Sequence, residues 1–241
     1  LRTIRAHLVD GVVYQSQFAR DWWERACGST RVPSRVIYNG VNLDVYNPHG
    51  TSHRPVDRFR FLLVEGRLGG GYEIGLETAV RLIEALARQY GKASELMVVG
   101  KVAVSLQEMW QGQVNFPLVF IGSVPREQIP EIDRSAHVLY SADIHAACPN
   151  SVIEALACGL PVIAFDTGAL PELVQGDAGR IVPYGGDPWR LDTPDIPSLA
   201  RAAVEILTAQ DHFCRGARAR AEEAFGLDIM VAAYLDFLLS G

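Results

Sequence analysis

Residues 148–172 read "CPNSVIEALACGLPVIAFDTGALPE". This stretch joins a turn, a short apolar helix, a strand and a second turn rich in Gly and Pro. The strand, within "PVIAFD", is continuously apolar, which indicates burial on both faces and hence a parallel sheet covered by helices. In such a sheet, ligands lie beyond the carboxyl ends of the strands. The residues that follow the strands are therefore the first candidates for a binding site.

The chain from residue 58 onward repeats this alternation of strand and helix. Short apolar runs also occur in "FRFLLVEG", "ELMVVG", "PLVFIG", "HVLYSA" and "GRIVPY". Residues 74–90 carry apolar side chains at the spacing of a helix packed on a sheet. Residues 198–207, 212–224 and 228–239 also have helical patterns. The sequence therefore predicts an α/β fold with a parallel sheet flanked by helices.

A separate block precedes this pattern. Residues 10–16 and 35–42 predict strands, and residues 18–26 predict a helix that contains Trp22 and Trp23. The polar residues 47–57, which include Pro and Gly, are typical of a linker, so we place a boundary there. We expect the two tryptophans to pack in a core or between domains rather than to stack on a ligand.

Composition argues against several classes of protein. The chain has 241 residues and a net charge of −6, which disfavours a general nucleic-acid surface because such a surface needs a basic stripe. No stretch approaches the ~20 apolar residues of a membrane span, and no secretory leader is visible. The four cysteines lack a Cys-x-x-Cys pair, which favours free thiols. We expect a cytoplasmic location and, because the sequence opens as if inside a domain, a piece of a longer protein.

The first motif is "EGRLGGGYEIG", residues 65–75, which lies between a predicted strand and a predicted helix. Its three glycines, Gly69, Gly70 and Gly71, let a ligand approach the backbone, and the helix N-terminus that follows attracts anions. Arg67 could pair with a phosphate through two hydrogen bonds. The alternative is a loose turn with a solvated Arg, and the motif matches neither the dinucleotide fingerprint nor a Walker sequence.

The second candidate is Glu154, which has two interpretations. Ser151 and Glu154 have the spacing of a capping box, in which the Glu side chain satisfies the backbone N–H of the Ser. A Glu at a helix start beside a strand end is also well placed to accept hydrogen bonds from two ribose hydroxyls. Both interpretations use the same oxygens, so the spacing leaves them open.

The third motif is "DTGALPELV", residues 166–174, where Gly168 and the amides of Ala169 and Leu170 follow a buried strand. This could form a second amide cradle for an oxyanion, or a plain connection between a strand and a helix. Weaker candidates are Lys101, at another strand end, and Asp143 and His145 in an irregular loop. Cys148 and Cys158 have no nearby His arrangement that favours a nucleophile, so we interpret them as packing residues.

Residues 151–174, "SVIEALACGLPVIAFDTGALPELV", resemble the donor-binding half of retaining glycosyltransferases of the GT-B type, family 4, also described as glycosyl transferases group 1. The resemblance extends over essentially the whole chain. It implies a Rossmann-like GT-B donor domain at residues 51–225. Residues 1–50 would then be the end of an N-terminal acceptor domain, and residues 226–241 a helix that packs back towards that domain.

The resemblance also implies roles for single residues. Arg67 would bind the diphosphate and Glu154 the ribose, and these two residues would form the catalytic set. The amides of residues 168–170 would meet the phosphate or sugar, and Glu172 would brace that turn. The donor site implied in full consists of Gly66, Gly69, Gly70, Gly71, Tyr72, Lys101, Val124, His145, Asn150, Ser151, Gly168, Ala169, Leu170 and Glu172.

Two positions depart from the family pattern. Tyr72 stands where the family usually has a Lys, and Ala146 stands where it has the first Glu of a Glu-x7-Glu pair. Losing a donor to the departing diphosphate costs ~2–4 kcal/mol in comparable sites. The chain is therefore either a divergent enzyme or a non-catalytic sugar-nucleotide binding module. A GT-B enzyme of another reaction, such as an epimerase or a phosphorylase, is a third alternative.

The resemblance finally implies the reaction and the partners. A hexosyltransferase-type enzyme would take a sugar from a UDP-, GDP- or ADP-sugar and transfer it with retention to a glycan, lipid or small-molecule acceptor. We expect no cofactor and no metal, since no Asp-x-Asp run is present, and no nucleic-acid partner. Peripheral membrane association would come only through the rest of the N-terminal domain. The isolated chain would be inactive without that domain.

Overall fold

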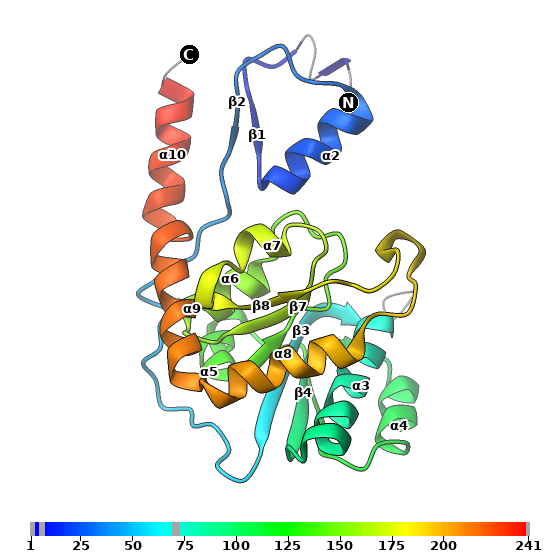
Figure 1. Ribbon diagram of the computed structural model, residues 1–241. Coiled ribbons are helices and arrows are strands. Elements are labelled where there is room, and N and C mark those ends of the chain that lie inside the picture. Colours follow the sequence, from blue (N-terminus) through cyan, green and yellow to red (C-terminus); the bar gives the residue numbers. More distant parts are fainter. Residues whose placement is uncertain (1–2, 5–7, 69–72, 240–241) are drawn as a thin grey trace.

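The computed structural model describes residues 3–4, 8–68 and 73–239. Its centre is a six-stranded, fully parallel sheet with the order β5-β4-β3-β6-β7-β8 (Figure 1). The strands are β3 (Phe59–Leu68), β4 (Ser94–Val102), β5 (Leu118–Gly122), β6 (Val138–Tyr140), β7 (Val162–Phe165) and β8 (Gly179–Val182). The apolar runs in the sequence correspond to these strands, so the predicted parallel α/β fold is confirmed.

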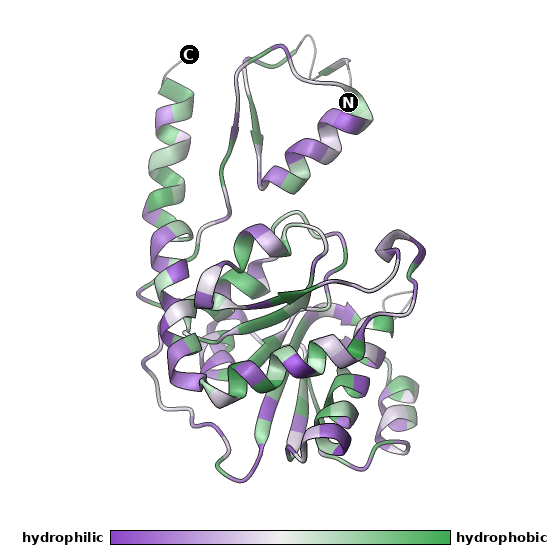
Figure 2. Cartoon of the chain, viewed as in Figure 1, coloured by the Kyte–Doolittle hydropathy of each residue, from purple (hydrophilic) through white to green (hydrophobic). Residues whose placement is uncertain are grey.

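Helices cover both faces of the sheet because its strands carry apolar side chains on both sides. Phe61 and Leu63 of β3 belong to the core beneath α3 (Glu73–Tyr90) and α8 (Ile196–Thr208). Leu62, between them, points into the opposite core, which α5 (Ile129–Arg134), α6 (Asn150–Ala157) and α9 (Gln210–Ala224) cover. Figure 2 shows the strands as mostly hydrophobic, in agreement with burial on two faces.

Several shorter helices complete the sheet domain. A helical turn at Pro171 was expected, and the others were not predicted. The α-helices are α4 (Val104–Gln111) and α7 (Leu170–Leu173), and the 3₁₀ turns are η1 (Arg126–Gln128), η2 (Gly176–Ala178) and η3 (Pro188–Arg190). None exceeds eight residues, which is too short for a clear amphipathic period.

The N-terminal block, residues 8–47, forms a unit of its own. Strands β1 (Val12–Tyr14) and β2 (Ser34–Val36) pair in parallel, with α2 (Gln17–Cys27) between them in sequence. The last helix, α10 (Leu227–Leu239), runs alongside this block (Figure 1), where Arg35 Nη1 lies 2.5 Å from Asp236 Oδ2. Within the described residues, no helix has both the length and the apolarity needed to cross a membrane.

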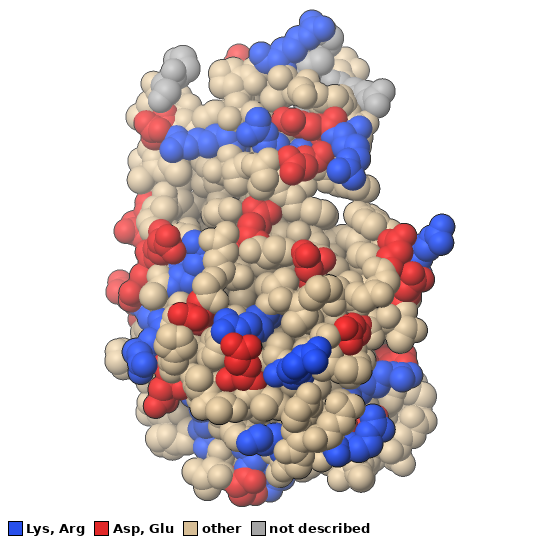
Figure 3. All heavy atoms as spheres, viewed as in Figure 1, with Lys and Arg blue, Asp and Glu red and all other residues tan. Residues whose placement is uncertain are grey.

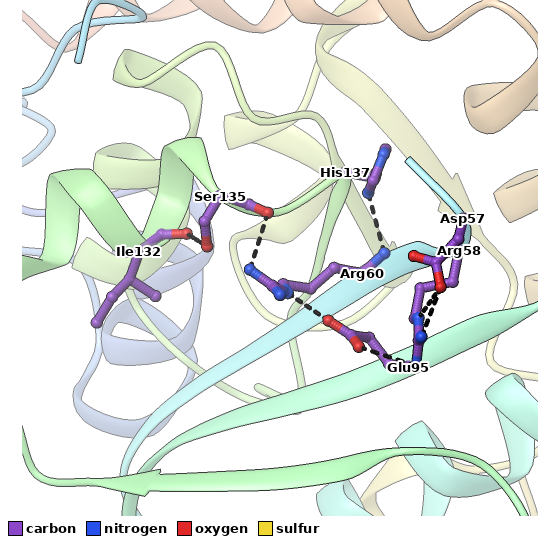
Figure 4. A network of polar contacts seen from close by, with 7 residues as sticks. All are labelled: Asp57, Arg58, Arg60, Glu95, Ile132, Ser135 and His137. Atoms are coloured by element: carbon purple, nitrogen blue, oxygen red, sulfur yellow. Dashed lines mark hydrogen bonds and ion pairs between the residues drawn. The ribbon is translucent and has the colours of Figure 1, made fainter. Parts of the chain in front are cut away.

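A polar network ties β3 to β4 at the amino-terminal end of the sheet (Figure 4). Arg60 Nε donates to Glu95 Oε1 at 2.5 Å, and Arg60 Nη1 donates to the carbonyl of Ser135 at 3.3 Å. The Arg60 backbone N–H donates to Nδ1 of His137. Burial lowers the pKa of His137 to about 4. Because the Glu95 side chain is only 9% exposed, its charge depends on Arg60 for compensation.

We predict that Glu95→Gln lowers the free energy of unfolding by about 3 kcal/mol, because it leaves the half-buried Arg60 guanidinium without its counter-charge. Urea unfolding at neutral pH measures this loss. Glu77→Gln is the matched control: it breaks an exposed ion pair with Arg81 and should cost less than about 0.5 kcal/mol. Equal effects of the two substitutions would contradict the role given to the network.

Candidate functional site

The candidate site lies at the carboxyl-terminal edge of the sheet, where the N-terminal block faces the loops after β3 and β6. A cleft of about 510 Å³ opens there, which we call the central cleft. Figure 3 shows a notch in the surface between the N-terminal block and the sheet domain. Residues from both parts line the central cleft: Gln15, Asn39, Val64, Glu65, Gly66, Asp143, residues 146–149, Ser151 and Glu154.

Glu154 lies on α6 and faces the central cleft. Its carboxylate accepts a hydrogen bond from Arg126 Nη2 at 3.1 Å, and the Glu154 side chain is 12% exposed while that of Arg126 is 70% exposed. Burial raises the pKa of Glu154, although Arg126 opposes this effect. Helix α6 begins at Asn150 without a side-chain cap. The predicted capping box between Ser151 and Glu154 is therefore not formed, because this carboxylate turns towards Arg126.

A second cavity, of about 630 Å³, adjoins the central cleft. We call it the acidic cavity, because Glu65 and Asp143 line both it and the central cleft. Its other lining residues are Leu68, Ile74, Gly75, Ala142, Ile144, His145, Ala146 and Leu191.

A bulge in β3 carries Glu65 to the edge of these cavities. The pairing of β3 with β4 shifts register between Val64 and Arg67. Gly100 of β4 makes room for the bulge, since a Cβ there would lie 1.8 Å from the Glu65 carbonyl oxygen, and its φ of +133° is one that side chains rarely adopt. The close approach of the two strands thus fixes the position of Glu65.

The surroundings of Glu65 and Asp143 raise the pKa of both carboxyl groups. Burial raises the pKa of Glu65 to about 8, and the charge of Asp143 contributes to this increase. Burial also raises the pKa of Asp143. Two neighbouring carboxyl groups out of water disfavour double ionisation, so the pair carries less than its full negative charge.

Arg67 and Lys101 line a third cavity, of about 640 Å³, which we call the basic cavity. They are register partners at the ends of β3 and β4, and both are exposed. We predicted that Lys101 faces the same cleft as Glu154, but Lys101 and Arg67 line the basic cavity and Glu154 lines the central cleft. Leu68 lines both the basic and the acidic cavity, so the two are neighbours of opposite charge.

The expected amide cradle at residues 168–170 is not open. The Ala169 N–H donates to the Ala146 carbonyl at 3.0 Å, and the Leu170 N–H donates to the Thr167 carbonyl at 3.2 Å. Gly168, with φ +56°, packs so tightly that a Cβ would lie 2.8 Å from the Ala146 oxygen. These groups hold the loop of residues 145–146 in place, a contact between distant segments that the local sequence could not indicate.

Glu172 joins the sheet domain to the N-terminal block instead of bracing only its own turn. Its Oε2 accepts from the Gln17 backbone N–H at 2.8 Å and from the Tyr38 hydroxyl at 3.0 Å, and its Oε1 accepts from the Phe18 N–H at 2.9 Å. Gln17 and Phe18 are the first residues of α2. The carboxylate thus satisfies two free amides at the positive end of this helix.

Neighbouring groups complete this junction. The hydroxyl of Ser16, the N-cap residue of α2, accepts from the Ala19 N–H at 3.0 Å. Arg220 of α9 donates to the backbone carbonyls of Glu172 and Leu173 from the other side. Helix α2 is therefore anchored through α7 to the helical layer beneath the sheet.

Two further contacts hold the N-terminal block against the site. Asn39 Nδ2 donates to Asn150 Oδ1 at 2.9 Å. Trp22 of α2 stacks on Trp189 of η3 with ring centroids 4.5 Å apart, and the ring of His145 stacks on Trp189 at 3.4 Å. The packing of Trp22 between domains agrees with the prediction. His145 lines the acidic cavity.

The remaining predicted residues lie as follows. Gly66 and Ser151 line the central cleft, and Val124 packs against the core beside α6. Gly69, Gly70, Gly71 and Tyr72 lie outside the described residues. Cys148 and Cys158 are buried and all four thiols are free, as predicted. Among the described residues, no three His, Cys, Asp or Glu side chains form a group suited to a metal ion, and metal-free chemistry stays a prediction.

Sequence reasoning missed several residues of the site: Gln15, Asn39, Tyr46, Glu65, Arg126 and Trp189. Only Glu65 had a local signal, because it is an acidic residue at the end of the apolar run "FLLV". The others reach the site through contacts over long sequence separations. A cavity of about 800 Å³, larger than these three, lies elsewhere, between residues of the linker and α9, and its described lining contains none of the predicted site residues.

Comparison with known proteins gives a family match. The family model described as glycosyl transferases group 1 matches residues 60–209. An uncharacterized glycosyltransferase of Methanocaldococcus jannaschii is 23% identical over 186 residues, which cover 70% of this chain and 47% of that protein. A GDP-mannose-dependent alpha-(1-6)-phosphatidylinositol dimannoside mannosyltransferase of Mycobacterium tuberculosis is 27% identical over 222 residues, 88% of this chain and 53% of that protein. The chain spans about half the length of these relatives.

Solved structures share the fold. Sucrose-phosphate synthase from Thermosynechococcus elongatus aligns with 100% of this chain and 61% of its own, with a TM-score of 0.74 and 20% identity. Anabaena HepE in complex with UDP and glucose aligns with 97% of this chain and 64% of its own, with a TM-score of 0.71 and 20% identity. At 20% sequence identity, the similarity to these two structures establishes the fold of this chain and nothing further.

We predict that Glu172→Gln loosens the N-terminal block, because an amide side chain has only one oxygen to accept the bonds that two carboxylate oxygens accept. Hydrogen exchange at the Gln17 and Phe18 amides should accelerate about tenfold, which corresponds to ~1.4 kcal/mol. The pKa of Tyr38, raised to about 12 by burial and then by Glu172, should fall.

Glu24→Gln provides the control for this experiment. Glu24 lies on the same helix, where it pairs with Arg20, and its substitution leaves the helix start intact. Unchanged exchange in Glu172→Gln, or the same acceleration in Glu24→Gln, would show that the carboxylate does not anchor α2.

We predict that Glu65→Gln makes the protein less sensitive to alkaline pH. The folded protein holds a proton on Glu65 up to about pH 8, whereas a free Glu loses it near 4.5, so stability falls as pH rises through this window. The variant should be more stable than the wild type by about 2 kcal/mol at pH 9, with little difference at pH 4.5. Thermal unfolding at both pH values measures the two differences, and a constant difference would contradict the assignment.

Proposed function

Because this chain belongs to the family of glycosyl transferases group 1, we propose that it forms the donor-binding half of a glycosyltransferase. In this proposal the full protein takes a sugar from a nucleotide-diphosphate sugar and transfers it to an acceptor with retained anomeric configuration. The acceptor, a glycan, a lipid or a small molecule, approaches from the side of the N-terminal block.

The observation that carries the proposal is the position of Glu154. Its carboxylate faces the central cleft at the carboxyl-terminal edge of the sheet, where α/β proteins bind nucleotides. Arg126 donates to Oε1 only, and a carboxylate has about four acceptor sites. The Tyr46 side chain is a second hydrogen-bond partner of this carboxylate. About two acceptor sites therefore remain, enough for both ribose hydroxyls while Arg126 and Tyr46 stay in place.

The diphosphate belongs, in this proposal, next to Arg67 and Lys101. Both cations line the basic cavity together with the first turn of α4 and one acidic residue, Glu73. Two cations and a helix N-terminus stabilise the negative charge that a departing nucleoside diphosphate develops, so catalysis is electrostatic and needs no metal. Leu68 lies between this cavity and the acidic cavity, so the sugar and the diphosphate meet different surroundings.

The identity of the nucleotide is a further part of the proposal. UDP occurs in the HepE complex, and the mycobacterial relative is named for GDP-mannose, so UDP and GDP are the first candidates and ADP is the third. The second candidate function is a non-catalytic sugar-nucleotide binding module. Ala146 favours it, because this wall residue of the central cleft carries only a methyl group.

We predict that one of UDP, GDP and ADP binds this chain in calorimetric titrations. Glu154→Ala should weaken that binding by about 10- to 100-fold, because two hydrogen bonds to the ribose are lost. Arg67→Ala should weaken the binding of the nucleoside diphosphate more than the binding of the matching monophosphate, because the monophosphate does not reach the basic cavity.

Glu84→Ala and Arg88→Ala are the controls, since both residues lie on the exposed face of α3 and line none of the three cavities. A folded chain that binds none of the three nucleotides, or a Glu154→Ala variant with unchanged affinity, would overturn the proposal. In the full-length protein, sugar transfer with retention supports the enzyme, and donor binding without any turnover supports the binding module.

A further inference from the structure

The acidic cavity contains two partly buried carboxyl groups, and none of its described lining residues is a Lys or an Arg. Glu65 and Asp143 line it together, from the β3 bulge and from the loop after β6. Among the described residues, no ion pair joins either of them to a Lys, an Arg or a His. Even partly buried carboxyl groups without a counter-charge are costly, so a pair held in this position indicates a group that binds to it.

Two buried polar atoms around the same space also lack a partner. The Tyr184 hydroxyl, in a residue that is 6% exposed, makes no hydrogen bond with the described residues. It faces a small inner pocket that shares Gly75, Asp143 and Ile144 with the acidic cavity. His145 Nε2, on the wall of the acidic cavity, has no partner within the described part either. Such atoms are rare in native interiors, so they indicate a polar ligand.

The rest of the lining is apolar, which narrows the ligand class. Leu68, Ile74, Ile144 and Leu191 provide hydrocarbon surface between the polar groups. Carboxyl oxygens and an imidazole nitrogen suit hydroxyl groups, while the apolar side chains suit the C–H face of a ring. This combination fits an uncharged polyhydroxylated ring, and residual negative charge on the pair repels an anionic one.

We propose that Glu65 and Asp143 are specificity-determining residues that bind the hydroxyls of an uncharged donor sugar in the acidic cavity and exclude sugars bearing a carboxylate or a sulfonate. This inference rests on the proposed function. It assigns the two ends of the donor to neighbouring cavities of opposite charge: the diphosphate to Arg67 and Lys101, and the sugar to Glu65 and Asp143.

The loop that carries Asp143 has a fixed shape. The Thr167 hydroxyl donates to the Asp143 carbonyl at 3.0 Å, and the Ala169 N–H holds Ala146 three residues further on.

A hexose differs from its uronic acid only in the oxidation state of one carbon, so the comparison of the two isolates the effect of charge. A fixed pair should discriminate between them strongly.

The test compares donors that differ only in this charge. Calorimetric titration of the 241-residue chain uses UDP-glucose against UDP-glucuronic acid, and GDP-mannose against GDP-mannuronic acid. For the nucleotide that binds, we expect the conjugate of the neutral sugar to bind at least about tenfold more tightly than the conjugate of the uronic acid. In the Glu65→Gln/Asp143→Asn double variant this ratio should fall to about twofold.

Glu84→Gln is the charge-matched control on the exposed face of α3 and should keep the wild-type ratio. Near-ultraviolet circular dichroism and thermal unfolding check that the double variant is folded; if it is not, the single variants Glu65→Gln and Asp143→Asn replace it, and each should lower the ratio.

Three results would overturn the inference. The first is equal wild-type affinity for the neutral and anionic sugars, and the second is a ratio that the substitutions do not change. The third is a loss of affinity for the nucleotide alone, in the variant, that equals its loss of affinity for the nucleotide sugar. In each case UDP or GDP still binds, so the proposed function stands without this specificity. Absence of binding by every nucleotide and conjugate would overturn both.

Discussion

The carboxylate of Glu172 connects the two parts of the chain on which the candidate site depends. It lies in a short helix of the sheet domain and accepts hydrogen bonds from the first two amides of α2. Because α2 follows directly after β1, this bond sets the position of Gln15, and the bond between Asn39 and Asn150 adds a second fixed point. The wall of the central cleft that faces Glu154 thus depends on one charge at one helix terminus.

The sheet could be predicted from sequence because burial on two faces leaves a strong local mark. Strands such as β7 (Val162–Phe165) are apolar at every position, and a parallel arrangement explains such a run. The long helices α3, α8 and α9 were likewise visible from their periodicity. Helix α4 was missed because its eight residues carry too little of the 3.6-residue period to distinguish it from a loop. Helix α7 is shorter still, but Pro171 marked its start.

The site was less predictable, for a physical reason that two residues illustrate. Glu154 lies inside a distinctive local segment, so its place at the strand ends could be anticipated, whereas its bond with Arg126 spans 28 residues of sequence and could not. The amides of Ala169 and Leu170 had the pattern of an anion cradle, but the carbonyl of Ala146 occupies one of them. Local sequence indicates which groups are available, and tertiary packing determines which of them remain free.

The stack of Trp22 on Trp189 gives the chain an optical property that follows from the geometry alone. Two indole rings 4.5 Å apart and inclined by 17° are close enough for their electronic transitions to couple, and the far-ultraviolet circular dichroism of such a pair depends on both the separation and the relative orientation of the rings. One ring belongs to the N-terminal block and the other to the loop at η3. The far-ultraviolet circular dichroism of this pair therefore reports a change in the relative position of the two parts, readable during ligand binding without any attached label.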